Sequence, residues 1–367
     1  MATEQEVIAD EARFIDMPAV VDDAMDVVDR TKALFSTPKY PDGGRALQVG
    51  WLTGEHFRAY CAVRPGSPDT DLIRISYTAA REIYRDAFVL PLFCERHFSQ
   101  AQYEPIFGPM RFGGGTVRVL PEGLTTDTAK TRIMNATLAW LYLHEQSHLF
   151  QNHGSIGLEL DASWAGADSM IDEMRDGDGK AVTGRSAALS HVFELAADHE
   201  ALNNIVGLIL KANSDTIPAH TVWSLVVGLT CMFQRFYGVE DRVYGEEVVG
   251  THPDPSFRVR MLLRGMTLMI MQPSVRRFAP WIEEREDLEA VMDHAVIVAT
   301  IYCQLRYRGG HGVSAFLPGV QAYTDVPMLY QQALFDTWEE ARPLVLRDYR
   351  GWGEECVLEL PHLAHLS

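Results

Sequence analysis

The sequence has little cysteine, and no two cysteines stand at a spacing that binds metal. Its five cysteines, Cys61, Cys94, Cys231, Cys303 and Cys356, are scattered over 367 residues without a C-x-x-C pair. Zinc sites built from cysteine show close pairs of that kind, so none is expected here. An odd, dispersed set without an export signal is typical of reduced thiols in a cytoplasm. We therefore predict a cytoplasmic protein with mostly buried thiols.

Long hydrophobic runs and positive charge are also scarce. The longest apolar runs, residues 222–233 and 295–303, are shorter than the ~20 residues of a transmembrane helix. The acidic N-terminus is not followed by a signal-type apolar run. The chain carries 32 Lys and Arg against 50 Asp and Glu, a net charge of −18. Because the apolar runs are short, we expect no membrane span. Because nucleic acid and anionic membrane surfaces attract basic proteins, we expect neither as the main partner of this acidic chain.

Apolar residues make up 47% of the chain, which is ample for a sizeable core. Helical periodicity dominates, and strand-like stretches are few. The sequence predicts a predominantly helical α+β fold with a small, edge-exposed sheet, divided into an N-terminal helical segment, a central domain and a C-terminal helical extension. The three predicted parts are residues 1–46, 47–275 and 276–367. Predicted strands are 47–52, 57–63 and 72–77, and predicted helices are 78–98, 129–150, 186–211, 217–237, 256–271, 282–306 and 327–346.

One predicted helix carries an H-E-x-x-H motif at residues 144–148. The stretch 129–150 contains no Gly or Pro and has apolar positions at helical spacing. Residues 125–127 (Thr-Thr-Asp) offer N-caps, and residues 152–154 (Asn-His-Gly) offer a C-terminal stop. The flanking Leu, Trp, Tyr and Phe residues indicate that this helix is largely buried, so that polar groups on it need partners.

On such a helix, His144 and His148 are i,i+4 neighbours on one face, and both imidazoles can reach one zinc ion. Glu145 lies one position along and can accept a proton from a water molecule held by the metal. A solvated helix that carries His and Glu for solubility is the alternative, but the apolar flanks argue against it.

A third ligand is available on the next long helix, predicted over 186–211. Glu194 and Asp198 are i,i+4 on this helix, so a Glu that binds metal brings an Asp to the same face. Such an Asp can accept the free ring N–H of a ligand His and fix its tautomer. An E-x-x-x-D pair is common on helices and is weak support for a metal site by itself. It becomes strong support here because it follows an H-E-x-x-H motif on a separate helix. Since zinc bonds reach only ~2 Å, a distant Glu194 carboxylate would exclude the site.

With these motifs the chain resembles the gluzincin metallopeptidases, in particular the HtpX-like and CAAX prenyl-endopeptidase group and the Lit-type phage-exclusion peptidases. The resemblance covers roughly residues 105–270. It departs from the HtpX-like pattern where an Asn-Ala pair usually enters the strand before the active helix; here the residues are Met110-Arg111-Phe112. Four segments carry the likeness: His144-Glu145-x-x-His148, Glu194-x-x-x-Asp198, Thr251-His252-Pro253 with Arg258, and the glycine-rich stretch 113–124.

The resemblance implies a zincin-like domain that hydrolyses peptide bonds with Zn²⁺. It implies that His144, His148 and Glu194 are the zinc ligands, Glu145 the general base and Asp198 a support behind the ligands. His252 or Arg258 would stabilise the transition state, with Tyr142, Tyr237 and Tyr244 as further candidates for that role. The edge strand, with Gly114, Gly115, Thr116 and Val117, would pair with the backbone of a protein or peptide substrate.

Several alternatives remain open from the sequence. Pro253, Asp254 and Pro255 with Thr251 as cap also make an ordinary helix start. His153 and His191 flank the motifs and can serve next to the ligands. The acidic, glycine-dotted residues 154–184 predict a solvated loop near the cleft.

At the level of function there are two alternatives to a general endopeptidase. One is a triggered phage-exclusion or toxin-type protease that cuts a single host protein. The other is an inactive, zinc-bearing module that binds a peptide without cutting it. The sequence selects neither a substrate nor an oligomeric state.

Overall fold

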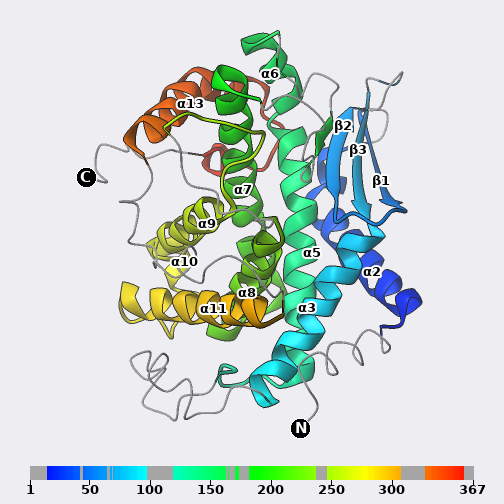
Figure 1. Cartoon of the computed structure of the whole chain (residues 1–367), viewed down its shortest axis with the longest axis vertical. Coiled ribbons are helices and arrows are strands. Elements are labelled where there is room, and N and C mark those ends of the chain that lie inside the picture. The colour runs from blue at the N-terminus through cyan, green and yellow to red at the C-terminus, as the bar shows by residue number, and fades with distance from the viewer. Residues whose placement is uncertain are drawn as a thin grey trace.

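The chain folds mainly into helices (Figure 1). The computed structural model describes residues 15–41, 44–63, 67, 69–96, 119–162, 164, 170–172, 182–236, 246–306 and 327–358. Over these residues it has ten α-helices and one four-stranded sheet. The prediction of a predominantly helical α+β fold is therefore confirmed.

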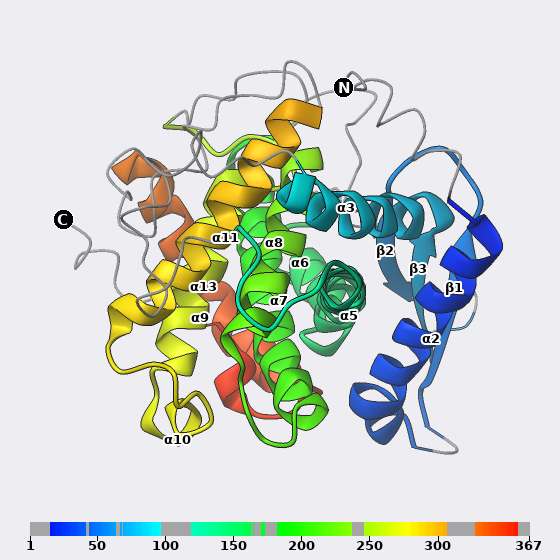
Figure 2. The same ribbon diagram turned by 90° about the horizontal axis from the view of Figure 1, so that it is seen from below.

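Helix α5 (Thr126–Phe150) runs through the middle of the molecule. Its start is fixed by a capping box, in which Thr125 Oγ1 accepts from the Thr128 N–H and Thr128 Oγ1 accepts from the Thr125 N–H. Nearly every side chain from Thr137 onward is buried. Figure 2 shows α5 end-on: the sheet and α2 (Met17–Phe35) lie on one side of α5, and α7 (Gly184–Ala212) and α8 (Ala219–Phe236) lie on the other. Helix α3 (Tyr77–Arg96) packs across α5 as well. The sequence predicted this helix and its cap.

The sheet supplies the layer on one side of α5. Strand β3 pairs in parallel with β1 and antiparallel with β2, and β2 pairs antiparallel with β4, giving the order β1-β3-β2-β4. Strands β2 and β3 contact α5. Alternate residues such as Ile73 and Ile75 on β3 are buried, as expected for a strand with one covered face. The strands are β1 (Ala46–Leu52), β2 (Ala59–Val63), β3 (Thr70–Ser76) and β4 (Met170–Asp172), and α3 (Tyr77–Arg96) follows β3.

Helices form the layer on the other side of α5. Helices α7 and α8 pack directly against α5, α9 packs on both of them, and α11 packs on α8. Apart from the short α10, which was not predicted, the positions of these helices match those predicted from hydrophobic periodicity to within a few residues. They are α7 (Gly184–Ala212), α8 (Ala219–Phe236), α9 (Pro255–Ile270), α10 (Pro273–Arg276), α11 (Arg285–Arg306) and α13 (Met328–Asp348), with short 3-10 turns η1 (Thr37–Lys39) and η4 (Glu354–Cys356).

The solvated loop predicted at residues 154–184 is wrong for two parts of that segment. Helix α6 (His153–Leu160) begins directly after Asn152, which has a left-handed backbone (φ 53°) and turns the chain out of α5. Strand β4 pairs with β2. Two glycines within α6 conceal its helical pattern, and β4 is stabilised by a strand more than 100 residues earlier, which local sequence does not reveal. Residues 113–118 of the predicted edge strand 113–124 lie outside the described residues, and residues 119–124 form bends and a turn rather than a strand.

The buried apolar residues form two clusters. The larger runs from Val20 on α2 through the sheet, α5 and α8 to Cys303 on α11. The smaller joins α6, the first half of α7, α13 and the segment after it. The larger cluster crosses both predicted boundaries, at 46 and at 275, and the smaller cluster crosses the one at 275; the domain division itself stays a prediction. All five cysteines are free and buried, as predicted.

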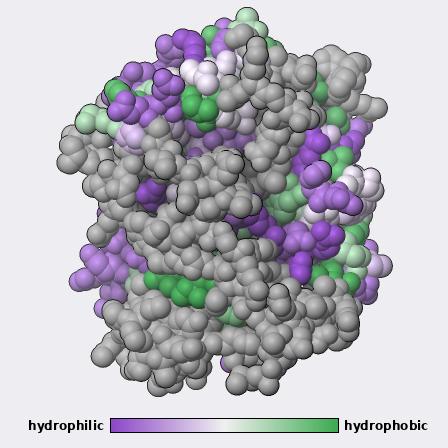
Figure 3. Space-filling model, in the orientation of Figure 1, coloured by the Kyte–Doolittle hydropathy of each residue, from purple (hydrophilic) through white to green (hydrophobic). Residues whose placement is uncertain are grey.

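None of the described helices combines the length and apolar composition needed to cross a membrane. On the face shown in Figure 3, hydrophobic residues of the described surface appear in separate groups among hydrophilic ones.

A buried histidine joins α11 to α8. His294 is only 1% exposed, and the Trp223 indole N–H donates to its Nδ1 at 2.8 Å. The ring must be neutral to accept this hydrogen bond, and burial lowers its pKa from 6.5 to about 4. The contact therefore ties α11 to the central helices only while His294 is uncharged.

We predict that His294 makes folding stability depend on pH between 6.5 and about 4. Because its pKa is lower in the folded state, its contribution is complete above 6.5 and is lost as the pH falls through this window, at a total of roughly 3 kcal/mol. Urea unfolding at a series of pH values measures it. His294→Gln, which can accept the same bond without titrating, should show a smaller pH dependence; an unchanged pH dependence in this variant contradicts the assignment.

Candidate metal centre

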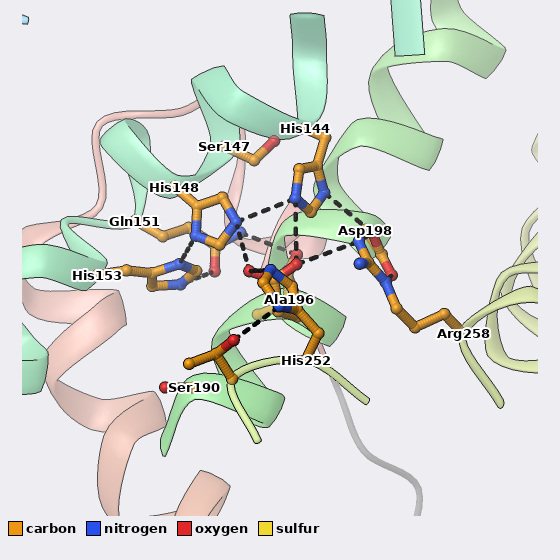
Figure 4. A network of polar contacts seen from close by, with 12 residues as sticks. His144, Ser147, His148, Gln151, His153, Ser190, Ala196, Asp198, His252 and Arg258 are labelled. Atoms are coloured by element: carbon orange, nitrogen blue, oxygen red, sulfur yellow. Dashed lines mark hydrogen bonds and ion pairs between the residues drawn. The ribbon is translucent and has the colours of Figure 1, made fainter. Parts of the chain in front are cut away.

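Three buried side chains from two helices, α5 and α7, meet near the C-terminal end of α5 (Figure 4). His144 and His148 project from one face of α5, with their Nε2 atoms 3.1 Å apart. Glu194 projects from α7, with Oε2 3.4 Å from His144 Nε2 and Oε1 3.4 Å from His148 Nε2. One donor atom of each residue lies within 4.8 Å of the others. Two residues that are 46 positions apart in sequence, His148 and Glu194, are thus direct neighbours.

A second carboxylate, that of Asp198, contacts the ring nitrogen of His144 that faces away from Glu194. Asp198 lies one turn after Glu194 on α7, and its Oδ1 is 2.9 Å from His144 Nδ1. A carboxylate in this place accepts the Nδ1–H and fixes the tautomer, which leaves the lone pair of Nε2 directed at Glu194 and His148. The predicted i,i+4 arrangement of Glu194 and Asp198 therefore has the predicted geometric consequence.

Arg258 on α9 pairs with both carboxylates of α7. Its Nε and Nη2 donate to the two oxygens of Asp198 at 2.9 and 2.8 Å, and Nη2 also lies 3.2 Å from Glu194 Oε2. The guanidinium is 2% exposed and stands over the Phe233 ring. These contacts favour a positioning role for Arg258; the predicted contact with a transition state stays a prediction.

The charges around Glu194 keep it ionised despite burial. Burial by itself raises the pKa of the Glu194 carboxyl, but the neighbouring His252, Arg258 and His148 side chains and the contact with His144 hold that pKa well below its ordinary value of 4.5. A carboxylate that remains negatively charged is the form that binds a metal ion.

His252 approaches the centre from the segment before α9. Its Nε2 lies 3.8 Å from Glu194 Oε1, and its Nδ1 is hydrogen-bonded to Thr251 Oγ1 at 2.9 Å. The helix itself begins as the simpler interpretation predicted, except that Asp254 rather than Thr251 is the cap, accepting from the N–H groups of Ser256 and Phe257. The predicted helix start is therefore confirmed with a different cap, and the catalytic role of His252 stays a prediction.

Glu145 faces the sheet side of the centre. It is completely buried, directly follows His144, and lies beside the Cys61 thiol on β2. Burial raises the pKa of Cys61, and the neighbouring Glu145 carboxylate raises it further, so the thiol is neutral. The sequence did not indicate Cys61 as part of the site, because it lies on another element more than 80 residues away.

The donor set suits a metal ion. Two imidazole nitrogens and a carboxylate converge on one point, and Asp198 orients the lone pair of His144 toward it. The ligand nitrogens and carboxylate oxygens lie 3.1–3.4 Å apart, close enough for one ion to contact all three side chains. The cluster can therefore hold a metal ion, although three donors of this kind accommodate several divalent metals.

The remaining predicted residues lie elsewhere or outside the described residues. Tyr142 points toward α2, where its OH is 2.5 Å from Ser36 Oγ. His191 is hydrogen-bonded to the Tyr330 OH of α13 at 2.9 Å. The predicted substrate strand and two further tyrosines lie outside the described part of the chain: Gly114, Gly115, Thr116, Val117, Tyr237 and Tyr244.

Comparison with known proteins adds no relationship to this geometry. No protein-family model matches the chain, and no curated protein or solved structure matches it. A function for this protein therefore follows from the arrangement of His144, His148 and Glu194.

Proposed function

We propose that this protein is a zinc-dependent endopeptidase of the gluzincin type, with a zincin-like domain built around α5. The observation that carries the proposal is the convergence of the His144, His148 and Glu194 donor atoms within 4.8 Å, with Glu145 next to the first ligand. A structural cluster of buried polar residues does not require this order along the chain. A helix that presents imidazoles at i and i+4 and a carboxylate at i+1 supplies two ligands and a general base for a hydrolytic metal site.

Zinc is the metal that this donor set favours in a catalytic role. Catalytic zinc sites use three protein ligands from His, Glu, Asp or Cys, whereas structural sites usually use four. Among the described residues, the candidate group has three members. When bound, zinc polarises a carbonyl oxygen and lowers the pKa of water toward ~7.

Glu145 is the residue that we expect to move the proton. Its carboxylate can take a proton from the attacking water and pass it to the leaving amine. Asp198 keeps His144 in the tautomer that leaves Nε2 free, and Arg258 holds the Asp198 and Glu194 carboxylates in place. Asp198 and Arg258 in this way position the metal ligands His144 and Glu194.

His252 is the residue best placed to contact substrate. Its side chain is 19% exposed, whereas those of His144, His148, Glu194 and Arg258 are at most 2% exposed. Substrate would therefore approach from the His252 side. A donor there can stabilise the oxyanion of the tetrahedral intermediate, which is worth roughly 3–4 kcal/mol where such a donor has been removed elsewhere.

We predict that Glu145→Gln abolishes peptide cleavage while zinc remains bound. The amide cannot accept a proton, and loss of a general base typically lowers rates by about 10²–10⁴-fold. The measurement compares new protein N-termini in cells that express wild type or Glu145→Gln, with zinc content determined on both purified proteins.

Equal sets of termini from the two proteins would rule out Glu145 as general base. A protein that binds zinc and peptide without cutting would behave in the same way with either residue.

We predict that His148→Ala loses the metal. Removing one of three ligands leaves an incomplete site, so zinc should fall from about one equivalent to a trace. Elemental analysis after dialysis against a weak chelator measures the content. The control is His220→Ala, which changes a half-buried histidine at the start of α8. Full zinc content in His148→Ala would exclude His148 as a ligand.

We predict that Arg258→Met destabilises the metal-free protein more than the zinc-bound protein. Losing the guanidinium leaves two buried carboxylates without it, at a cost of about 3–5 kcal/mol, and a bound cation beside Glu194 offsets part of this. Denaturant unfolding with and without zinc measures the difference.

The matched control for that experiment is Arg347→Met. Arg347 binds Glu159 with two hydrogen bonds, but at the surface, with both side chains about half exposed. Surface pairs contribute little, so this variant should change stability only slightly and without dependence on zinc. A zinc effect of equal size in both variants would contradict the prediction.

A further inference from the structure

The second histidine ligand, His148, starts a chain of buried polar contacts that leads away from the metal centre (Figure 4). His148 Nδ1 lies 2.8 Å from His153 Nδ1, at the start of α6. His153 Nε2 lies 3.1 Å from Gln151 Oε1, and Gln151 Nε2 donates to Glu200 Oε2 at 2.8 Å. His153, Gln151 and Glu200 are all completely buried.

If His148 binds a metal, the donor and the acceptor of each hydrogen bond in this series of contacts are determined. If His148 Nε2 is to offer a lone pair to a metal, its proton must be on Nδ1 and must be donated to His153 Nδ1. His153 must then carry its own proton on Nε2, which it donates to Gln151 Oε1. The Gln151 amide is thereby oriented with its NH₂ toward the Glu200 carboxyl group and the Ala196 carbonyl. Each contact is satisfied in only one sense.

This series of polar contacts ends at the segment that follows α13. The Tyr349 OH lies 2.9 Å from Glu200 Oε1. Gly351 packs against the same pair, since a Cβ at that position would lie 2.5 Å from Glu200 Oε1 and closer still to the tyrosine. Two neighbouring contacts fix this segment to the end of α5: the Arg350 N–H donates to the Phe150 carbonyl, and Asn152 Nδ2 donates to Asp348 Oδ2.

The two ligand histidines are thus supported in different ways. Asp198 contacts His144 directly. For His148 the corresponding carboxyl group is Glu200, and two uncharged side chains stand between them. His153 is also fixed by stacking on Phe193, with ring centroids 4.3 Å apart and planes inclined by 13°.

We propose that His153, Gln151 and Glu200 are positioning residues that hold His148 in its metal-binding tautomer and orientation, and that Tyr349 makes metal affinity depend on the segment after α13. The proposal rests on the metal centre under Proposed function and extends it to residues outside the three ligands. Partners behind metal ligands of this kind typically contribute about 10–100-fold to metal affinity.

The test measures the affinity of the metal-free protein for Zn²⁺ by competition with a chromophoric chelator, and the visible absorption spectrum of the Co²⁺-substituted protein. His153→Phe keeps an aromatic ring on Phe193 but removes the acceptor for His148. We expect about 10–100-fold weaker Zn²⁺ binding and an altered Co²⁺ spectrum. His153→Asn returns an acceptor oxygen near the Nδ1 position, and should bind Zn²⁺ more tightly than His153→Phe.

Two milder variants test the far end of the chain. Glu200→Gln and Tyr349→Phe should each weaken Zn²⁺ binding by several-fold, less than His153→Phe does. The matched control is His294→Phe, the same exchange at a buried histidine whose partner is Trp223 on another pair of helices. It should lower stability but leave Zn²⁺ affinity and the Co²⁺ spectrum unchanged.

The outcomes separate this proposal from the proposed function. If wild type binds Zn²⁺ tightly and His153→Phe and Glu200→Gln bind it with the same affinity and give the wild-type Co²⁺ spectrum, the positioning role is wrong while the metal centre stands. If His153→Phe does not fold, Glu200→Gln and Tyr349→Phe decide in the same way. If wild type itself does not bind Zn²⁺, the metal centre is wrong.

Discussion

The balance of buried charge beside α5 is the constraint on which the rest of the structure depends. Glu145, Glu194 and Asp198 bring three carboxyl groups into a region that is at most 2% exposed, and Arg258 brings one guanidinium that pairs with two of them. Buried charges are costly unless they are compensated. A divalent cation among His144, His148 and Glu194 would supply the missing positive charge. The composition of the centre therefore argues for a metal independently of any motif.

This centre needs a rigid support, and α5 provides it. The helix is enclosed by the sheet and α2 on one side and by α7 and α8 on the other, so its side chains have little freedom. Its contact with α8 is close enough to require glycine, because a Cβ at Gly228 would lie 1.9 Å from Thr137 Oγ1. A helix buried on all sides keeps the ligand imidazoles in place before any metal binds, which lowers the entropic cost of assembling the site.

The parts that sequence could predict are those whose physical cause is local. The cap at Thr125, the i,i+4 pairing of His144 with His148, and that of Glu194 with Asp198 all follow from helix geometry. The support for His148 does not, because Glu200 and Tyr349 are 149 residues apart and meet only through tertiary packing. Likewise β4 depends on a distant partner strand and α6 on the left-handed turn at Asn152. Local sequence contains neither cause.

The different hydrogen-bond partners of His144 and His148 would affect the Lewis acidity of a metal ion bound between them. A carboxylate in direct contact with a ligand imidazole makes that imidazole a stronger electron donor, and the metal then becomes a weaker Lewis acid. Among the described residues, the Asp198 carboxylate contacts His144 Nδ1, whereas the uncharged ring of His153 contacts His148 Nδ1. A metal held by one strongly donating and one weakly donating imidazole retains more of its positive charge than one with two carboxylate-bound histidines. Retained charge is what a hydrolytic site requires, because it lowers the pKa of water and polarises a carbonyl.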